Sequence, residues 1–139
     1  MHKEFKIAVI DGQGGGIGKT IIETLKKEDL NVEIIALGTN SVATSRMLKS
    51  GADAAATGEN AIIFNSKKAD IIVGVLGLLV ANSMLGEVTK KIAEAIGKSE
   101  ALKVLIPLEK CKIIITTPTD LSLQENIDNA VKIIKSNLN

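Results

Sequence analysis

The sequence of 139 residues has almost no aromatic side chains: it contains two phenylalanines and no tyrosine or tryptophan. Hydrophobic residues still make up 45% of the chain, so a folded core must consist of aliphatic side chains. Seventeen basic and sixteen acidic residues leave a net charge of +1, and no block of basic residues is present. Nucleic-acid-binding proteins commonly depend on a basic surface or on aromatic rings that stack on bases. We therefore expect no nucleic-acid partner.

Cysteine and histidine are also scarce, with Cys111 and His2 as their only examples. One cysteine excludes an intramolecular disulfide and a cysteine-based zinc site, and we expect no metal site. A lone histidine near a chain end offers neither a Ser-His-Asp nor a Cys-His arrangement for nucleophilic catalysis. We interpret Cys111 as a small apolar filler beside an edge strand.

Long hydrophobic segments are missing as well. The longest apolar run, residues 71–81, is too short to span a bilayer, and residues 1–6 contain no hydrophobic signal region. These two absences predict a cytoplasmic protein without a membrane partner.

Short apolar runs alternate with helical patterns through most of the chain. Predicted strands cover residues 6–10, 32–37, 53–56, 71–75, 104–106 and 113–115. Predicted helices cover residues 17–25, 42–50, 60–68, 88–97 and 123–138. Such apolar runs are typical of strands that are buried on both faces in parallel sheets. The pattern predicts a single domain over residues 1–139, with a three-layer α/β/α Rossmann-like architecture and an open, mostly parallel sheet.

The C-terminal part of the chain is expected to depart from this alternation. Residues 104–106 and 113–115 are too close in sequence for a crossover helix, so we expect them to form a hairpin at one sheet edge. Ser122 and Glu125 have the spacing of a capping box, which predicts the start of the last helix. The predicted buried face of that helix consists of Leu123, Ile127, Ala130, Val131, Ile134 and Leu138.

The most informative segment is the glycine-rich turn, residues 12–18, which joins the first predicted strand to the first predicted helix. Five of its seven residues are glycine. Each glycine costs folding about 0.5–1 kcal/mol relative to alanine, and an ordinary turn needs only one or two. The surplus is explained if backbone N–H groups must approach a ligand closely. Because helix N-termini favour anions, we predict that the turn binds phosphate; the alternative is a tight turn required only by packing.

The turn contains the spacing Gly-x-x-x-Gly-Ile-Gly, formed by Gly12, Gly16, Ile17 and Gly18. This spacing resembles the cofactor-binding turn of short-chain dehydrogenases, and the resemblance implies that the pyrophosphate of NAD or NADP lies on the turn. The sequence departs from that family at Asp11, where the family usually has Thr or Ser. It also has no tyrosine, so the family's catalytic Tyr-x-x-x-Lys motif cannot exist.

A second resemblance concerns the phosphate loop of NTP-binding proteins, Gly-x-x-x-x-Gly-Lys-[Ser/Thr]. Gly18, Lys19 and Thr20 match its end, but Gln13 occupies the position of its first glycine. The variant loop of partition-type ATPases is also similar, although Gly14 stands where that family has a further lysine. No predicted strand supplies the acidic residue that would hold magnesium through water. An NTP-binding protein that uses Lys19 and Thr20 is therefore the second interpretation.

Other polar residues follow the predicted strands at their carboxyl ends, where open α/β sheets bind ligands. Thr39, Asn40 and Ser41 stand where NAD-binding proteins usually have an acidic residue for the ribose. A 2′-phosphate would not be repelled there and could also reach Arg46, so we predict a slight preference for NADP over NAD. Capping of the next helix by Asn40 and Ser41 explains these residues equally well.

These considerations define a predicted site. Its cofactor-binding residues are Gly12, Gln13, Gly14, Gly15, Gly16, Ile17, Gly18, Lys19, Thr39, Asn40, Ser41, Thr57 and Asn82. Asp11 and Glu59 are the candidates for acid–base catalysis. Asn82 and Ser83 interrupt an apolar stretch, so their polar groups need a cap or a ligand as partner.

The chain as a whole resembles a family of short uncharacterised proteins from anaerobic Gram-positive bacteria. The matching stretches are residues 7–19, 36–41, 57–62 and 81–87. The resemblance covers nearly the full length and includes Asp11, but it implies no activity.

We therefore predict an uncharacterised protein that binds a nucleotide, a dinucleotide or another small phosphate-bearing ligand on the glycine-rich turn. The alternatives are an NTP-binding protein, a small enzyme acting on a phosphorylated metabolite, and a structural protein whose turn is empty. The abundance of aliphatic residues in a short chain further predicts a homodimer that buries one helix face.

Overall fold

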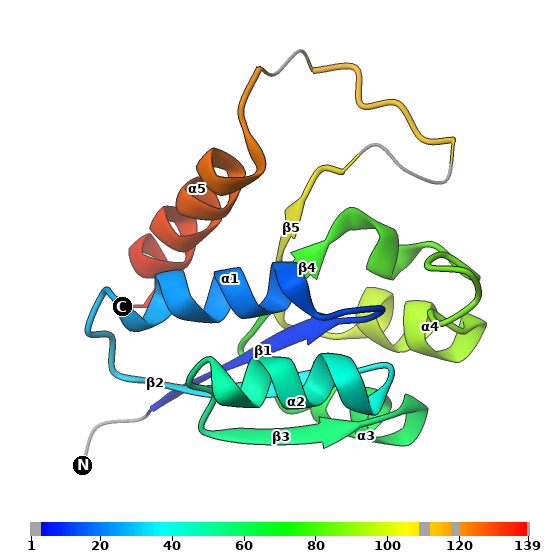
Figure 1. Cartoon of the computed structure of the whole chain (residues 1–139), viewed down its shortest axis with the longest axis horizontal. Coiled ribbons are helices and arrows are strands. Elements are labelled where there is room, and N and C mark those ends of the chain that lie inside the picture. Colours follow the sequence, from blue (N-terminus) through cyan, green and yellow to red (C-terminus); the bar gives the residue numbers. More distant parts are fainter. Residues whose placement is uncertain (1–3, 109–111, 118–119, 139) are drawn as a thin grey trace.

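Five parallel strands form the central sheet of the computed structural model, which describes residues 4–108, 112–117 and 120–138. The strands are β1 (Phe5–Asp11), β2 (Val32–Gly38), β3 (Ala54–Thr57), β4 (Ile71–Val75) and β5 (Leu102–Ile106). They lie side by side in the order β3-β2-β1-β4-β5 (Figure 1). This is the order of the first five strands in a Rossmann fold. The predicted α/β architecture is confirmed, and the described sheet is parallel throughout.

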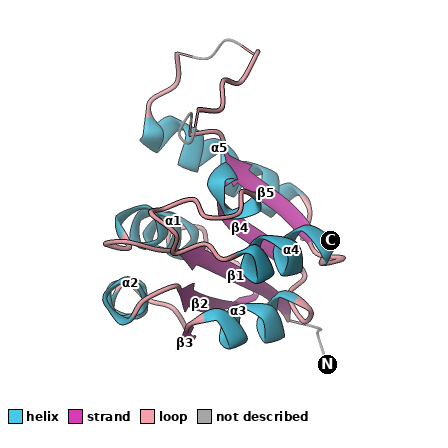
Figure 2. Cartoon of the chain, turned by 90° about the vertical axis from the view of Figure 1, so that its right-hand side faces the viewer, coloured by secondary structure: helices cyan, strands magenta, loops and turns pink. Residues whose placement is uncertain are grey.

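Helices cover both faces of this sheet. One face carries α1 (Gly16–Lys26), α2 (Ser41–Lys49) and α5 (Leu123–Ser136), and the other carries α3 (Glu59–Ser66), the 3-10 helix η1 (Leu76–Leu79) and α4 (Lys90–Lys98). Figure 2 shows the strands between α1 and α2 on one side and α3 and α4 on the other. Alternate residues of β1 supply the two core layers, with Ile7 and Val9 in one and Ala8 and Ile10 in the other. Within the described residues, none of the helices combines the length and the apolar character needed to cross a bilayer.

The central strands β1 and β4 determine where a ligand could bind. The last five residues of β1 and all five of β4 are buried, which explains their nearly continuous apolar sequences. β1 pairs with β2 on one side and with β4 on the other. After β1 the chain therefore continues to β2 and β3 on one side of that strand, and it later returns to β4 and β5 on the other side. Ligands of open α/β sheets bind at the carboxyl ends of the strands where the path diverges in this way.

The predicted C-terminal hairpin is wrong. β5 forms one edge of the sheet and pairs with β4 in the parallel direction. Residues 113–115 are not in a strand, and Ile114 is 81% exposed. Helix α5 packs against β5 and α1 on the face opposite α4, so the chain after β5 leads to that helix and residues 113–115 have no described strand beside them. The interpretation of Cys111 concerns a residue outside the described ranges.

Helix α5 begins where the sequence predicts. Ser122 Oγ accepts a hydrogen bond from the Glu125 N–H at 3.1 Å, and Glu125 Oε1 accepts one from the Ser122 N–H at 3.0 Å. Together these bonds form the predicted capping box. The buried face of α5 includes Ile127, Ala130, Val131 and Ile134. Leu123 departs from the prediction, because it borders a cavity and is 41% exposed.

Candidate functional site

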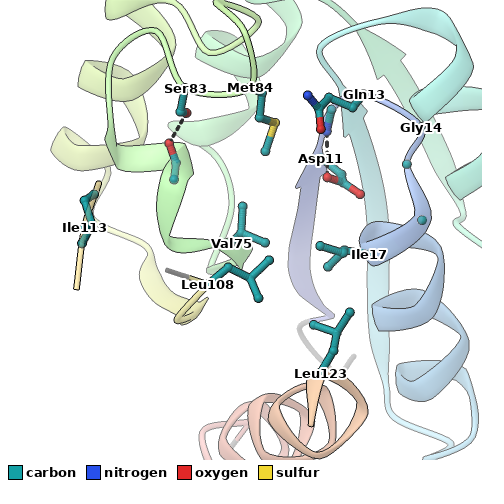
Figure 3. A pocket seen from close by; sticks show the side chains of 14 residues that line it. Asp11, Gln13, Gly14, Ile17, Val75, Ser83, Met84, Leu108, Ile113 and Leu123 are labelled. Carbon is teal, nitrogen blue, oxygen red and sulfur yellow. Dashed lines mark hydrogen bonds between the residues drawn. The ribbon is translucent and has the colours of Figure 1, made fainter. Parts of the chain in front are cut away.

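A cavity of about 440 Å³ lies at the carboxyl ends of β1 and β4, where the path of the chain diverges. The glycine-rich turn borders it with residues 12–17. The aliphatic side chains that border it are Ile17, Val75, Met84, Leu108, Ile113 and Leu123. Figure 3 shows Ile17 on the side of the turn, with Val75 and Leu108 across from it. The volume lies in the range of about 300–1,000 Å³ that is usual for small-molecule sites.

Close packing accounts for three glycines of the turn, most strictly for Gly15. A Cβ atom on Gly12 would lie 2.6 Å from Thr39 Oγ1, and one on Gly18 would lie 2.5 Å from Met47 Sδ. Gly15 has a left-handed φ of +73°, and its Cβ would lie 2.7 Å from a backbone atom of α2. The alternative explanation of the turn, close helix–strand packing, therefore accounts for these three positions.

Gly14 and Gly16 have no such structural reason. Neither has a left-handed φ, and the nearest atom to an added Cβ is Arg46 Nη1, at 3.9 Å from Gly14 and 3.6 Å from Gly16. Their N–H groups and that of Ile17 donate no hydrogen bond to any part of the chain that the structure describes. The three N–H groups belong to residues at the cavity border, at the N-terminus of α1. They form a set of donors that a bound anion could use.

The Asp11 side chain is hydrogen-bonded to the first and last residues of the glycine-rich turn. Its carboxylate accepts hydrogen bonds from the Gly12 N–H at 2.8 Å and from the Gly18 N–H at 2.7 Å, and the residue is 5% exposed. Burial raises the pKa of this carboxyl, the two backbone hydrogen bonds oppose the rise, and the nearby charge of Glu87 adds to it. One of the helix N–H groups predicted to bind phosphate, that of Gly18, is thus already bonded within the chain.

The Glu87 carboxylate accepts hydrogen bonds from a second set of donors near the turn. Its Oε1 atom accepts hydrogen bonds from the Gln13 N–H at 2.8 Å, from Thr39 Oγ1 at 2.6 Å and from Asn40 Nδ2 at 2.8 Å. We call these four residues the Glu87 cluster. The hydrogen bond from Thr39 is the main cause that lowers the pKa of Glu87, so its carboxylate stays ionised at neutral pH.

Two of the three residues predicted after β2, Thr39 and Asn40, therefore belong to the Glu87 cluster. Asn40 also caps α2, because its Oδ1 atom accepts the Ala43 N–H at 2.9 Å, which confirms the capping interpretation for Asn40. Ser41 begins α2 and is exposed. The structure gives no support to the preference for NADP, because the ionised Glu87 carboxylate lies where only uncharged side chains were expected.

Lys19 and Thr20 lie on α1 and are not among the described residues that border the cavity. Thr20 Oγ1 donates a hydrogen bond to the Gly16 carbonyl at 3.0 Å, within its own helix. In a phosphate loop this hydroxyl binds the magnesium ion. The NTP-binding interpretation therefore gains no support from the arrangement of these two side chains.

Thr57 and Glu59 also lie away from the cavity. Thr57 Oγ1 donates to Thr44 Oγ1 at 2.7 Å, which joins β3 to α2. Glu59 Oε2 accepts a hydrogen bond from Thr89 Oγ1 at 2.6 Å, which joins α3 to the residue that caps α4. The carboxylate whose charge acts on Asp11 is that of Glu87, whereas Glu59, the other candidate for acid–base catalysis, is bonded to Thr89.

The segment between η1 and α4 contains two site residues that the sequence did not predict, Met84 and Glu87. Asn82, the residue predicted there, is exposed, whereas Ser83 and Met84 border the cavity. Ser83 Oγ donates a hydrogen bond to the Gly77 carbonyl at 2.5 Å (Figure 3). The polar residues that interrupt this apolar stretch were the available signal. They did not indicate that Glu87 would reach the glycine-rich turn.

Comparisons with known proteins identify a family without an assigned activity. A universal stress protein solved in complex with cAMP has a TM-score of 0.43 at 19% identity, and the match covers 76% of this chain and 98% of that one. A dodecameric FMN-dependent Ubix-like decarboxylase from Escherichia coli O157:H7 has a TM-score of 0.42 at 17% identity, covering 94% of this chain and 76% of that one. No curated protein matches the sequence. The model of the family described as "Domain of unknown function (DUF3842)" matches residues 6–139, and the chain therefore belongs to this family.

Proposed function

We propose that the cavity binds a small ligand through an anionic group, such as a phosphate, that accepts hydrogen bonds from the N–H groups of Gly14, Gly16 and Ile17. The observation that carries this proposal is the pair Gly14 and Gly16, which neither packing nor backbone conformation requires. Their N–H groups have no partner in the described chain. The N-terminus of α1 adds a partial positive charge. The guanidinium of Arg46 lies beside both glycines but does not border the cavity, and it donates a hydrogen bond to the Gly14 carbonyl at 3.3 Å.

Two carboxylates border the turn, and neither competes for these three N–H groups. The Asp11 carboxylate is bonded to the N–H groups of Gly12 and Gly18, and that of Glu87 is bonded to the Gln13 N–H and two side chains. Hydrogen bonds to both carboxylates compensate part of their charge. The site therefore has separate places for the chain's own carboxylates and for a ligand.

A ligand that binds more than weakly must also contact the aliphatic side chains of the cavity. A hydrogen bond to a charged group contributes about 1.5–3 kcal/mol, and a helix N-terminus contributes about 0.3–1 kcal/mol. After the cost of association, such contributions give roughly millimolar affinity for inorganic phosphate. A tighter ligand must also bury apolar surface against Val75, Met84 and Leu108. A nucleotide has both a phosphate and an uncharged body, so nucleotides are the class to test first.

Thermal unfolding of the purified protein tests the proposal. It should be followed with inorganic phosphate, AMP, FMN, NADH and NADPH, and with ATP in the presence and absence of magnesium. A ligand at one hundred times its Kd adds about 2.7 kcal/mol of stability, which raises Tm by several degrees. We expect at least one phosphate-bearing compound to raise Tm. The absence of a shift with every compound would contradict the proposal.

A matched pair of variants assigns the binding to the turn. Gly16→Val places a branched side chain beside the N–H groups that have no described partner and should weaken binding at least about tenfold. Gly97→Val is the control, because Gly97 lies on α4, is exposed, and has Leu79 Cδ2 at 4.0 Å as the nearest atom to an added Cβ. The control should bind like the wild type. Equal affinity of the Gly16→Val variant and the wild type would place the ligand elsewhere.

A further inference from the structure

The cavity is bordered from only one side of β1. Among the residues that the structure describes, its border comes from the end of β1, the turn, the segment from β4 to Met84, and residues 108, 113 and 123. None of these described residues belongs to β2 or α2. Dinucleotide sites of Rossmann folds extend across both sides of β1, with the second nucleoside beside the end of β2.

The Glu87 cluster lies on the other side of β1, beside the end of β2. Three donors, from Gln13, Thr39 and Asn40, converge on a single oxygen of Glu87 within 2.6–2.8 Å. This arrangement joins the end of β2 to the glycine-rich turn through a side chain that comes from beyond β4. The place where a dinucleotide would leave the turn towards β2 is thus occupied by the chain's own carboxylate.

The segment that carries Glu87 is held by its own backbone bonds. The Asn82 N–H donates to the Val88 carbonyl at 2.7 Å, and the Val88 N–H donates to the Ser83 carbonyl at 3.2 Å. These bonds close residues 82–88 into a loop that also carries Met84 to the cavity border. The same loop therefore borders the cavity with Met84 and places Glu87 between the glycine-rich turn and the end of β2.

The geometry points to a ligand with one phosphate group and a body of mononucleotide size or smaller, and to Glu87 as the residue that excludes dinucleotides. This inference rests on the proposed binding of an anion to the turn. A second phosphate directed towards β2 would meet an ionised carboxylate and would find the donors of the Glu87 cluster already bonded. A single phosphate on Gly14, Gly16 and Ile17 leaves the cluster intact, while its body extends towards Val75 and Leu108.

Calorimetric titration with two matched pairs of compounds, FMN with FAD and NMN with NAD, tests this selectivity. Each dinucleotide contains its mononucleotide partner, so the ratio of the two Kd values isolates the effect of the added half. For at least one pair, we expect the wild type to bind the mononucleotide at least about tenfold more tightly. Glu87→Ala should reduce that ratio at least about fivefold, because it frees three donors and removes a negative charge.

Two further variants complete the experiment: Glu87→Gln separates the effect of charge from that of hydrogen bonding, and Glu94→Ala is the control. Glu87→Gln keeps an oxygen that can accept the three hydrogen bonds but removes the charge, so it should reduce the ratio less than Glu87→Ala while preserving the fold. Glu94 is exposed on α4 and pairs with Lys98, so its substitution should leave the ratio unchanged. A wild type that binds both members of each pair equally, or a ratio that neither Glu87 variant changes, would overturn the inference alone. Failure of all four compounds to bind the wild type would overturn this inference, and it would overturn the proposed function as well if inorganic phosphate, AMP and ATP also fail to raise Tm.

Discussion

Two groups of glycines lie within the same seven-residue turn and differ in what surrounds them. Gly12, Gly15 and Gly18 fit so closely against other parts of the chain that an added Cβ would lie less than 3.0 Å from a neighbouring atom. Gly14 and Gly16 have space around them and carry N–H groups without a described partner. A surplus of glycine is therefore not by itself evidence for a ligand. Only the glycines that packing leaves unexplained carry that argument.

Substitution by alanine should separate the two groups most clearly. Gly15→Ala requires a non-glycine residue at φ +73° and places a methyl group against the backbone of α2, so we expect a loss of about 2–4 kcal/mol in the free energy of unfolding. Gly16→Ala should remain within about 1 kcal/mol of the wild type, because its methyl group would make only an ordinary van der Waals contact, with Arg46 Nη1 at 3.6 Å. Urea denaturation measures both. Similar losses for the two variants would remove the distinction between packing and binding glycines.

The two carboxylates at the turn extend the comparison. Asp11→Ala leaves the N–H of the buried Gly18 without its partner, so we expect a loss of about 1–3 kcal/mol. Glu87→Ala should cost less, about 1 kcal/mol or below, because the Gln13 N–H and the amide of Asn40 are accessible enough to bond to water. Urea denaturation at neutral pH measures the difference. A larger loss for the Glu87 variant would show that the Glu87 cluster is a principal support of the fold.

The same carboxylates should have opposite and smaller effects on the pH dependence of stability. Burial raises the pKa of Asp11 in the folded chain, so its contribution to stability decreases as the pH rises from the ordinary carboxyl range, near about 4, towards that raised pKa. Hydrogen bonds lower the pKa of Glu87, so its contribution is present above its ordinary pKa and is lost as the pH decreases towards the lowered value.

Asp11→Asn and Glu87→Gln isolate these two contributions. With increasing pH, the stability of the wild type relative to Asp11→Asn should decrease, whereas its stability relative to Glu87→Gln should increase. Urea denaturation over the range from about pH 3 to pH 7 provides both slopes. Slopes of the same sign would contradict the assigned environments of the two carboxylates.

Most elements of the fold could be predicted because local patterns specify them. The apolar runs at residues 6–10 and 71–75 correspond to β1 and β4, and the capping box at Ser122 marks the start of α5. The hairpin could not be judged in this way. Residues 113–115 have the composition of a strand, but a strand also needs a partner beside it, and the chain has already left the sheet at that point.

The candidate site was predictable only in part, for a similar reason. The position of the glycine-rich turn followed from its place between a strand and a helix. The role of Glu87 depends on contacts with residues 48 and 74 positions away in the sequence, Thr39 and Gln13. Glu59 is also a glutamate and lies nearer to the predicted strand ends, but it bonds to Thr89 instead. Residue type alone did not distinguish the two glutamates.

The sequence by itself determined the alternation of strands and helices, the aliphatic core and the presence of the glycine-rich turn at the start of α1. These features depend on neighbouring residues, through hydrophobic periodicity, glycine content and helix capping. Only the tertiary structure decided the strand order, the cavity at the carboxyl ends of β1 and β4, and which N–H groups of the turn have no partner among the described residues. Those features depend on side chains and strands that are distant in sequence, and their positions are set by packing of the whole chain.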